Sequence, residues 1–335
     1  MANSKSKRAR KGGFFRTLFL LVLLFGAAAA AYLTLYRVSP GVEQFVLLPT
    51  GSGGLSIGAD LEKSGIVQSR YAFDLLHLVL RRKLKAGEYR FQDPATAFQV
   101  YQRIARGDVY LHTLAIPEGF NIFDISVAVE NAKLGTKEQF LQAARQDTKL
   151  IQDLDPTATS LEGYLFPDTY KFSRLDSVHT IAATMVKRFR QQAGLLGIKD
   201  NVHETITLAS LIEKEVAAPE ERPLVASVFA NRLSKRMPLA TDPTVIYAAL
   251  LENRYRGTIY VSDLQANSPY NTYKIIGLPP GPICNAGVAS MKAALHPAQS
   301  NYLYFVSDAQ GHSRFAATLA EHNRNVAAYR RATRR

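Results

Sequence analysis

The first long pattern in the chain is an uninterrupted apolar run near its amino terminus. From Thr17 to Tyr36 no residue is charged, and most are Leu, Phe, Val or Ala, between Arg16 and Arg37. A helix of this length, rising about 1.5 Å per residue, crosses a hydrocarbon core of about 30 Å. The pattern therefore predicts a single-pass transmembrane helix over 17–36.

The charges around this run predict its orientation. Residues 1–16 are strongly basic, and basic flanks stay in the cytoplasm. We therefore expect a cytoplasmic tail over 1–16, an inner-membrane anchor and a periplasmic remainder of the chain. A cleaved signal peptide is the alternative, because Ala27–Ala31 offers small residues to a peptidase. The length of the run and the interfacial positions of Tyr32 and Tyr36 favour a retained anchor.

Short alternating elements follow the run. Residues 37–49 are expected to be a linker, and 50–117 a small α+β domain. The patterns predict helices over 55–67, 71–84 and 96–106 and strands near 87–91 and 110–116. This arrangement resembles a LysM-like peptidoglycan-binding module. A docking domain that binds no glycan remains the alternative.

Residues 118–335 read as a mainly helical α+β domain. Amphipathic helices are expected over 121–154, 177–196, 203–216, 223–234 and 286–295 and from near Thr318, with a strand over 302–307. The whole chain is therefore expected to be α+β, with an anchor, a small domain and a larger, mainly helical domain.

One of these helices places a carboxylate on its apolar face. Leu208, Leu211, Ile212 and Glu215 fall at i, i+3, i+4 and i+7. Burial raises the pKa of a carboxyl group, so Glu215 could stay protonated near neutral pH and act as a general acid. Glu213 lies about 200° around the same helix and is the weaker candidate. The alternative is that Glu215 forms a salt bridge at the edge of the core.

Three later segments, over 239–247, 268–273 and 277–285, concentrate Tyr, Asn and Thr among Pro and Gly. Aromatic faces stack on sugar rings, and amides and hydroxyls bind sugar hydroxyl groups. Asp242 and Thr244 flank Pro243 at an apparent helix start, a place suited to fixing hydrogen bonds. Each segment alone is also typical of a tight turn. Together they supply the candidate substrate-binding residues Thr241, Asp242, Thr244, Tyr247, Tyr270, Asn271, Thr272, Tyr273 and Asn285.

Composition narrows the function classes. The net charge of +13 is concentrated at the two ends of the chain and would suit nucleic acid or anionic lipid. The apolar run favours the membrane, so no nucleic-acid partner is expected. Cys284 is the only cysteine, which rules out an intramolecular disulfide. No CxxC, HExxH, GxxxxGK or GxGxxG pattern occurs, so neither a metal nor a nucleotide cofactor is expected.

Several motifs in fixed order resemble the endolytic murein transglycosylase family, also called YceG-like. The resemblance covers nearly the entire chain, with small departures at Ala248 and Ala286. The motifs that carry it are Glu162-Gly163 with Phe166-Pro167-Asp168-Thr169-Tyr170, Ser210 to Glu215, Thr241 to Tyr247, Tyr270 to Tyr273, Gly277 to Asn285, His296-Pro297 and Tyr302 to Val306.

The resemblance implies an enzyme that cuts within nascent peptidoglycan strands and terminates their elongation. It would cleave the β-1,4 bond between N-acetylmuramic acid and N-acetylglucosamine without water, leaving a 1,6-anhydro end. Glu215 would be its acid, Glu162 and Asp168 would join the substrate-binding residues, and peptidoglycan synthases would be partners. Two alternatives stay open: a hydrolase with Asp242 or Glu162 as second carboxylate, and a non-catalytic wall-binding scaffold.

Overall fold

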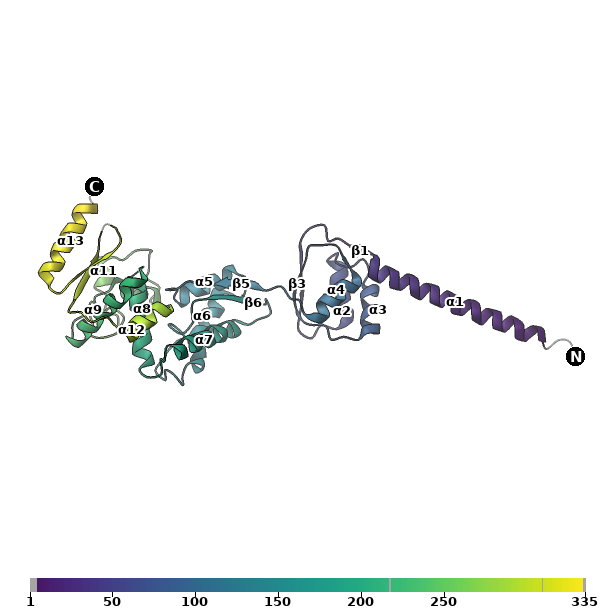
Figure 1. Cartoon of the computed structure of the whole chain (residues 1–335), viewed down its shortest axis with the longest axis horizontal. Coiled ribbons are helices and arrows are strands. Elements are labelled where there is room, and N and C mark those ends of the chain that lie inside the picture. The colour runs from purple at the N-terminus through teal and green to yellow at the C-terminus, as the bar shows by residue number, and fades with distance from the viewer. Residues whose placement is uncertain (1–4, 217, 309, 334–335) are drawn as a thin grey trace. The chain divides into compact units, whose positions relative to one another are not determined.

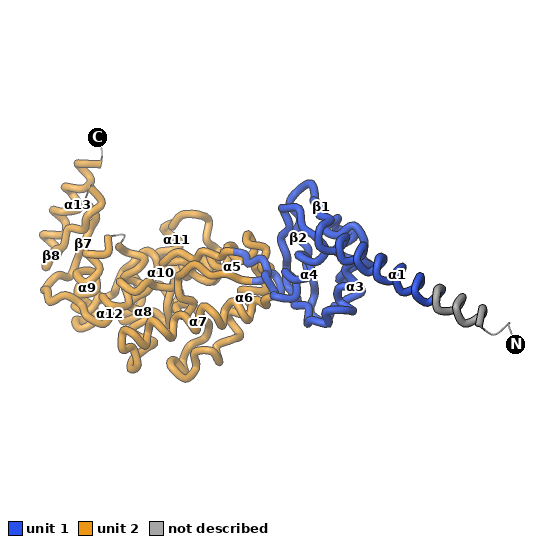
Figure 2. Tube along the Cα trace, turned by 45° about the vertical axis from the view of Figure 1, so that its right-hand side comes forward, with its two compact units in different colours: residues 1–112, 173–175 blue, residues 113–172, 176–335 orange. Residues whose placement is uncertain are grey.

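The computed structural model describes residues 5–216, 218–308 and 310–333, which form an α+β structure. The chain divides into two units, shown in Figure 2. Unit 1 runs to His112 and includes Ser173–Leu175. Unit 2 comprises Thr113–Phe172 and the chain from Asp176 onward. The functional roles expected for the tail, anchor, linker and two domains stay predictions.

Helix α1, Lys5–Leu35, contains the apolar run (Figure 1). Its part from Phe14 to Leu35 is long and apolar enough to cross a membrane, and its side chains are almost wholly exposed. A buried core helix would have packed most of this surface. Among the described residues, the structure therefore has one helix of membrane-spanning length and apolarity, at the expected place, and this helix already begins within the tail expected over 1–16.

Unit 1 is built on two short antiparallel strand pairs with helices between them. Strand β2 pairs with β3, with Val46 opposite Tyr89, and β1 pairs with β4. Two helices lie between β2 and β3 in the chain, which gives a β–α–α–β order. The elements are β1 Arg37–Val38, β2 Gln44–Leu48, α2 Gly54–Lys63, α3 Arg70–Leu80, β3 Gly87–Phe91, β4 Ala95–Thr96 and α4 Ala97–Arg106.

Local chemistry explains the ends of these helices. Thr96 and Gln99 form a reciprocal capping box that starts α4, and Gly107 ends it at a φ of 79°. Helix α3 ends at Leu80, four residues before the expected end, because Arg81 takes a left-handed φ of 50°. An apolar pattern alone does not reveal such a stop.

The structure differs from expectation over 37–49, which was expected to be a linker. This segment contains β1 and β2, and Val46 and Leu48 are buried in the core of unit 1 with Leu61, Phe73 and Tyr101. Burial alternates along β2, as in a strand with one face on a core. Five residues are too few for the alternation to stand out in the sequence.

Unit 2 is mainly helical, and most of its long helices agree with the expected ones to within a few residues. The helix expected over 121–154 is instead divided into α5 and α6. Two of its strands, β6 and β8, were not expected from the sequence. The helices are α5 Ile122–Asn131, α6 Lys137–Gln146, α7 Val178–Leu195, α8 Val202–Glu215, α9 Arg222–Ser234, α10 Asp242–Leu251, α11 Val261–Leu264, α12 Val288–Leu295 and α13 Leu319–Thr333. The strand pairs are β5 His112–Ala115 with β6 Thr169–Phe172, and β7 Tyr304–Ser307 with β8 Ser313–Ala316.

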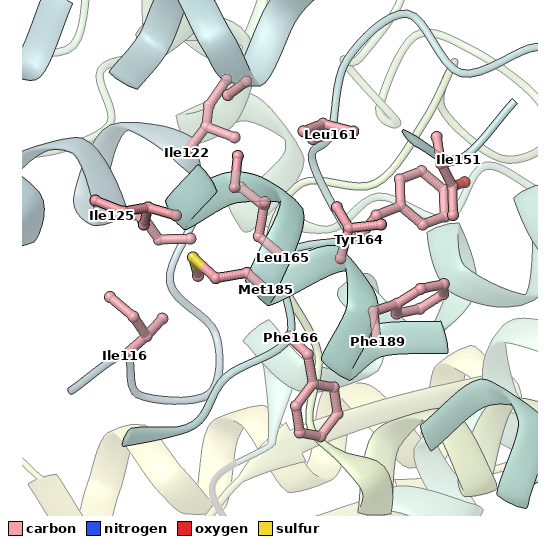
Figure 3. Close-up of a cluster of buried hydrophobic side chains, with 14 of the residues drawn as sticks. Ile116, Ile122, Ile125, Ile151, Leu161, Tyr164, Leu165, Phe166, Met185 and Phe189 are labelled. Atoms are coloured by element: carbon pink, nitrogen blue, oxygen red, sulfur yellow. The ribbon is translucent and has the colours of Figure 1, made fainter. Parts of the chain in front are cut away.

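Two hydrophobic clusters hold helix α8 in unit 2. The larger cluster includes Tyr164, Leu165, Met185 and Phe189, shown in Figure 3, and reaches Ala209 of α8. The second packs Leu211 and Ile212 of α8 against side chains of α9 and α10. Well-packed side chains leave a helix little freedom to shift. Helix α8 is therefore a firm support for its last residue, Glu215.

Candidate active site

Glu215 lines a cavity of about 400 Å³ in unit 2. The other polar side chains around it come from α9, from the turn before α10, from the loop at Tyr273 and from α13. They are Arg232, Thr241, Asp242, Tyr273 and His322. Apolar and aromatic walls are provided by Phe229, Leu239, Tyr304, Phe305 and Leu319. A cavity with apolar walls and a few convergent polar groups is typical of a ligand site.

The pKa of the Glu215 carboxyl group is raised. Burial is the main cause, and the Asp242 carboxylate adds to the rise, because a second negative charge disfavours ionisation. Arg232 opposes it. The Thr241 hydroxyl also opposes it from nearby, although it forms no hydrogen bond of good geometry among the described residues. The net result is a carboxyl group that holds its proton to a higher pH than a free glutamic acid.

Asp242 is held by an aromatic residue from another loop. The Tyr273 hydroxyl donates a hydrogen bond to Asp242 Oδ1 at 2.7 Å. Burial raises the pKa of Tyr273, and the neighbouring Asp242 adds to the rise, so the phenol keeps its proton at any physiological pH. Asp242 is the first residue of α10, where the helix dipole favours a negative charge. It therefore presents a carboxylate to the same cavity as Glu215.

A strained turn brings Thr241 and Asp242 to the cavity. Ala240 has a φ of 49°, a left-handed conformation that costs a residue with a Cβ about 1–2 kcal/mol. Two hydrogen bonds to Thr272 hold the turn in place. The Ala240 amide donates to Thr272 O at 3.0 Å, and the Thr241 amide donates to Thr272 Oγ1 at 3.0 Å. Backbone strain of this kind often occurs at functional sites.

Arg232 and His322 form another part of the wall. The Arg232 guanidinium donates to Leu303 O at 2.7 Å and to Leu239 O at 2.6 Å, and it lies 5.3 Å from the ring centroid of Tyr304. The Tyr304 ring stacks on His322 at 5.2 Å. Burial and the neighbouring Arg232 lower the pKa of His322, and its buried Nδ1 has no hydrogen-bond partner in the described structure. Such a nitrogen is available to a ligand.

Three residues expected to bind substrate lie behind the cavity. Thr244 Oγ1 donates to Thr241 O at 2.7 Å and lies 2.8 Å from Thr272 Oγ1. The Asn271 amide donates to Leu264 O and Ala266 O, and its oxygen accepts from the Tyr273 amide. All three side chains are fully buried. They hold the loops that present Thr241, Asp242 and Tyr273.

Glu162, Tyr247 and Asn285 form a separate buried network. The Glu162 carboxyl accepts from the Ile122 amide at 2.9 Å, from the Tyr247 hydroxyl at 3.0 Å and from Asn285 Nδ2 at 3.0 Å. Burial raises the pKa of Glu162 to about 8 against these hydrogen bonds. The network joins three segments distant in sequence and does not line the cavity of Glu215.

Two further candidates also lie elsewhere. The Tyr270 ring contacts Tyr247 at 5.2 Å and borders, with Glu162, a small cavity of about 10 Å³. That volume suits about one water molecule and not a sugar. Asp168 accepts a hydrogen bond from Arg188 Nε at 2.7 Å and is not part of the cavity wall either.

Glu213, the second carboxylate of α8, points to a different environment. It pairs with Arg222 at 3.0 Å and accepts from the Gly287 amide at 3.0 Å, with 5% of its side chain exposed. Glu118 also lies near Arg222, at 3.7 Å. These contacts join α8, α9 and the start of α12, so Glu213 has a structural role. Its different direction around the helix predicted that it would lie away from Glu215.

Sequence reasoning missed Arg232 and His322. Arg232 had a usable signal: Val225, Phe229 and Arg232 fall at i, i+4 and i+7 of α9, so a charged residue again sits on an apolar stripe. His322 had none, because it joins the cavity through the packing of α13 on β7 and β8. Tyr304 lay within a recognised motif but was not singled out.

Metal and thiol chemistry find little support in the geometry. Among the residues that the structure describes, no three His, Cys, Asp or Glu side chains gather in a way that could hold a metal ion. Cys284 is fully buried, its Sγ donates to Ser210 O at 3.3 Å, and burial raises the pKa of its thiol. A buried, protonated thiol is a poor nucleophile.

Comparisons with known proteins agree with each other. The model of the YceG-like family matches residues 46–328. A Bacillus subtilis protein named endolytic murein transglycosylase is 35% identical over 298 residues, covering 83% of this chain and 82% of its own. A Streptococcus pneumoniae protein of the same name is 30% identical, covering 94% of this chain and 62% of its own. The crystal structure of a YceG-like protein from Listeria monocytogenes matches with a TM-score of 0.56 and 34% identity, over 84% of this chain and 98% of that one.

Proposed function

Because the chain belongs to the YceG-like family, we propose that it is an endolytic lytic transglycosylase of peptidoglycan. It cleaves the β-1,4 bond between N-acetylmuramic acid and N-acetylglucosamine within nascent strands and leaves a 1,6-anhydro end. The names of the relatives support the substrate. The single observation that carries the chemistry is the position of Glu215, a carboxyl group of raised pKa on the wall of a cavity.

One carboxyl group suffices for this reaction. Protonated Glu215 donates its proton to the glycosidic oxygen, and the bond from that oxygen to C1 of the muramic acid breaks. The Glu215 carboxylate then takes the proton of the C6 hydroxyl of the same sugar, whose oxygen forms a new bond to C1. The acid is regenerated and no water is consumed. Because nucleophile and electrophile belong to one ring, correct orientation lowers much of the barrier.

The other cavity residues divide into two roles. Thr241, Asp242, Tyr273 and Tyr304 contact the sugars, with the Asp242 charge helping Glu215 to keep its proton. Arg232 and His322 complete the wall and fix the ring of Tyr304. The remaining predicted residues act as positioning residues through buried hydrogen bonds, ion pairs and ring contacts: Thr244, Asn271 and Thr272 under the turn, and Glu162, Tyr247, Tyr270, Asn285 and Asp168 farther away.

A hydrolase is the second candidate, and Asp242 is the observation that favours it. Asp242 lies on the wall of the same cavity as Glu215, as the second carboxylate of a hydrolase must. Glu162 does not line this cavity, so it is not the second carboxylate of this alternative. The Tyr273 hydroxyl occupies one oxygen of Asp242, which makes this carboxylate a weaker nucleophile.

The setting of the enzyme follows from unit 1. We infer that α1 anchors the chain once in the inner membrane with its basic end in the cytoplasm, and that unit 2 and the part of unit 1 after α1 are periplasmic. The β–α–α–β order of unit 1 supports a LysM-like module that binds glycan. Strand cleavage next to the membrane would terminate elongation, with peptidoglycan synthases as partners.

Mass analysis of products from purified, uncrosslinked glycan strands tests the proposal. Anhydro ends are lighter by one water than hydrolytic ends, and borohydride does not reduce them. The proposal expects anhydro ends as the main product. Reducing muramic acid ends would contradict it and would make Asp242 the second carboxylate of a hydrolase.

A further inference from the structure

Helix α3 carries an exposed apolar face. Phe73 and Leu76 are buried in the core of unit 1, whereas the outer side of the same helix leaves large apolar side chains open. Soluble domains rarely expose contiguous apolar patches without a function. The exposed fractions are 41% for Leu75, 65% for Leu78, 68% for Val79 and 37% for Leu80.

This face looks onto the apolar part of α1 across a groove of about 440 Å³. Helix α1 contributes Phe25, Ala29 and Leu33 to the groove, and α3 contributes Leu75, Val79 and Leu80. The only side-chain hydroxyl on its wall, that of Thr34, donates to Ala30 O at 2.7 Å within α1 and needs no other partner. The groove therefore offers its occupant an apolar surface alone.

The depth of the groove along α1 corresponds to the outer leaflet. The rings of Tyr32 and Tyr36 stack at 5.2 Å, and Tyr residues prefer the membrane interface. Phe25 lies two turns before Tyr32, or about 10 Å along the helix axis. Interfacial helices bury their apolar faces about 5–10 Å below the headgroup boundary. Helix α3 therefore lies beside the part of α1 that faces lipid, and not beside a part outside the membrane.

The charge at the end of α3 suits lipid headgroups. Arg81, Arg82 and Lys83 follow the helix directly, and all three side chains are exposed. Asp74 is the only acidic residue of α3, and it is turned toward Gly58 of α2, where a Cβ would lie 2.5 Å from its Oδ1. A row of basic residues beside an apolar face is typical of helices that bind anionic membranes.

We propose that α3 lies in the outer leaflet of the membrane that α1 crosses. The groove between the two helices holds a lipid acyl chain, and Arg81, Arg82 and Lys83 bind phosphate headgroups. The inference rests on the anchored topology proposed above. It makes unit 1 a domain with a membrane-bound side, attached by two helices and not by one.

Site-specific labelling of the full-length chain tests this. Cys284 is fully buried with a raised thiol pKa, so a thiol-reactive fluorophore labels an introduced cysteine selectively. Leu75→Cys reports on the groove. Leu47→Cys is the matched control, since Leu47 is 42% exposed and lies on β2, whose sheet with β3 is on the side of unit 1 away from α1 (Figures 1 and 2). Leu24→Cys reports on the anchor.

The labelled proteins are reconstituted in nanodiscs of phosphatidylcholine and phosphatidylglycerol that contain spin-labelled lipid. The proposal expects lipid quenching of the label at residues 75 and 24 and none at residue 47. If the label at residue 24 is quenched and the labels at residues 75 and 47 are both unquenched, the inference is overturned and the anchor remains supported. An unquenched label at 24 would overturn the anchored topology itself.

The headgroup part of the proposal has its own test. The quantity measured in the Leu75→Cys background is the excess of quenching in nanodiscs with phosphatidylglycerol over nanodiscs without it. The double variant Arg82→Glu/Lys83→Glu should lower this excess by about fivefold per residue, the equivalent of ~1 kcal/mol each. The control Lys149→Glu/Lys171→Glu makes the same charge change on exposed residues of unit 2 and should leave it unchanged. Equal quenching with and without phosphatidylglycerol in the unaltered background would contradict headgroup binding.

Discussion

At the scale of single residues, the two carboxylates of α8 make the sharpest comparison. Glu215→Gln keeps the size of the side chain but removes the proton that cleavage needs. General acids contribute about 10²–10⁴ to rate, so we expect activity to fall by that factor with the melting temperature nearly unchanged. The release of anhydro ends from purified strands measures the rate.

Glu213→Gln is the matched control on the same helix. It weakens a buried ion pair with Arg222, so we expect a loss of about 1–3 kcal/mol in unfolding free energy and largely retained activity per folded molecule. An inactive but folded Glu213 variant beside an active Glu215 variant would contradict the assignment.

Glu162 gives a prediction about pH and stability. Its pKa is about 8 in the folded chain and 4.5 in the reference state, so between these values the folded state binds more protons than the unfolded state. The contribution of Glu162 to the free energy of unfolding is then greatest below pH 4.5. It falls as pH rises toward 8, by up to about 1.4 kcal/mol per pH unit. Denaturant unfolding between pH 5 and 8 should show a shallower decline in Glu162→Gln than in the unaltered chain. Parallel declines would contradict the raised pKa.

At the scale of elements, the turn from Leu239 to Asp242 controls the site geometry. Ala240→Gly relieves the left-handed strain but adds freedom to the unfolded chain, so we expect a stability change within about 1 kcal/mol and full activity. Ala240→Val places a β-branched residue at the same φ, and should lower the melting temperature and displace Thr241 and Asp242. Activity assays beside thermal unfolding test this pair. Equal activity in both variants would mean that the turn does not position the site.

Elements were the level at which the sequence was most informative. The helices of unit 2 could be predicted because their apolar periodicity is local, and the phase of α8 separated Glu215 from Glu213. The cavity itself could not be predicted, because it depends on contacts between distant segments. Thr241 and Thr244 are three residues apart, yet one lines the cavity and the other supports the turn. Glu162 belongs to one of the family motifs, yet it lies in a buried hydrogen-bond network away from the cavity. The spacing of residues in the sequence does not reveal this position.

At the scale of the whole molecule, unit 2 contains every residue of the cavity. A chain starting at Arg37 should therefore leave the membrane fraction and still cleave uncrosslinked strands at a rate close to that of the full chain. It should unfold at a lower temperature in unit 1, because it loses Leu33, which is buried in that core. Fractionation, strand cleavage and thermal unfolding measure the three effects. Loss of cleavage by this folded chain would mean that the anchor contributes to catalysis.

The order of the cavity residues along the chain sets when the enzyme can first act. Glu215 comes from α8, whereas Leu319 and His322 come from α13, the last helix that the structure describes. In the anchored topology proposed above, the chain crosses the membrane from its amino-terminal side, so Glu215 reaches the far side before the helix that completes its cavity. Until α13 has packed on β7 and β8, the cavity lacks the part of its wall that Leu319 and His322 provide. If the proposed function and topology hold, the site is therefore incomplete while the chain is still passing through the export channel.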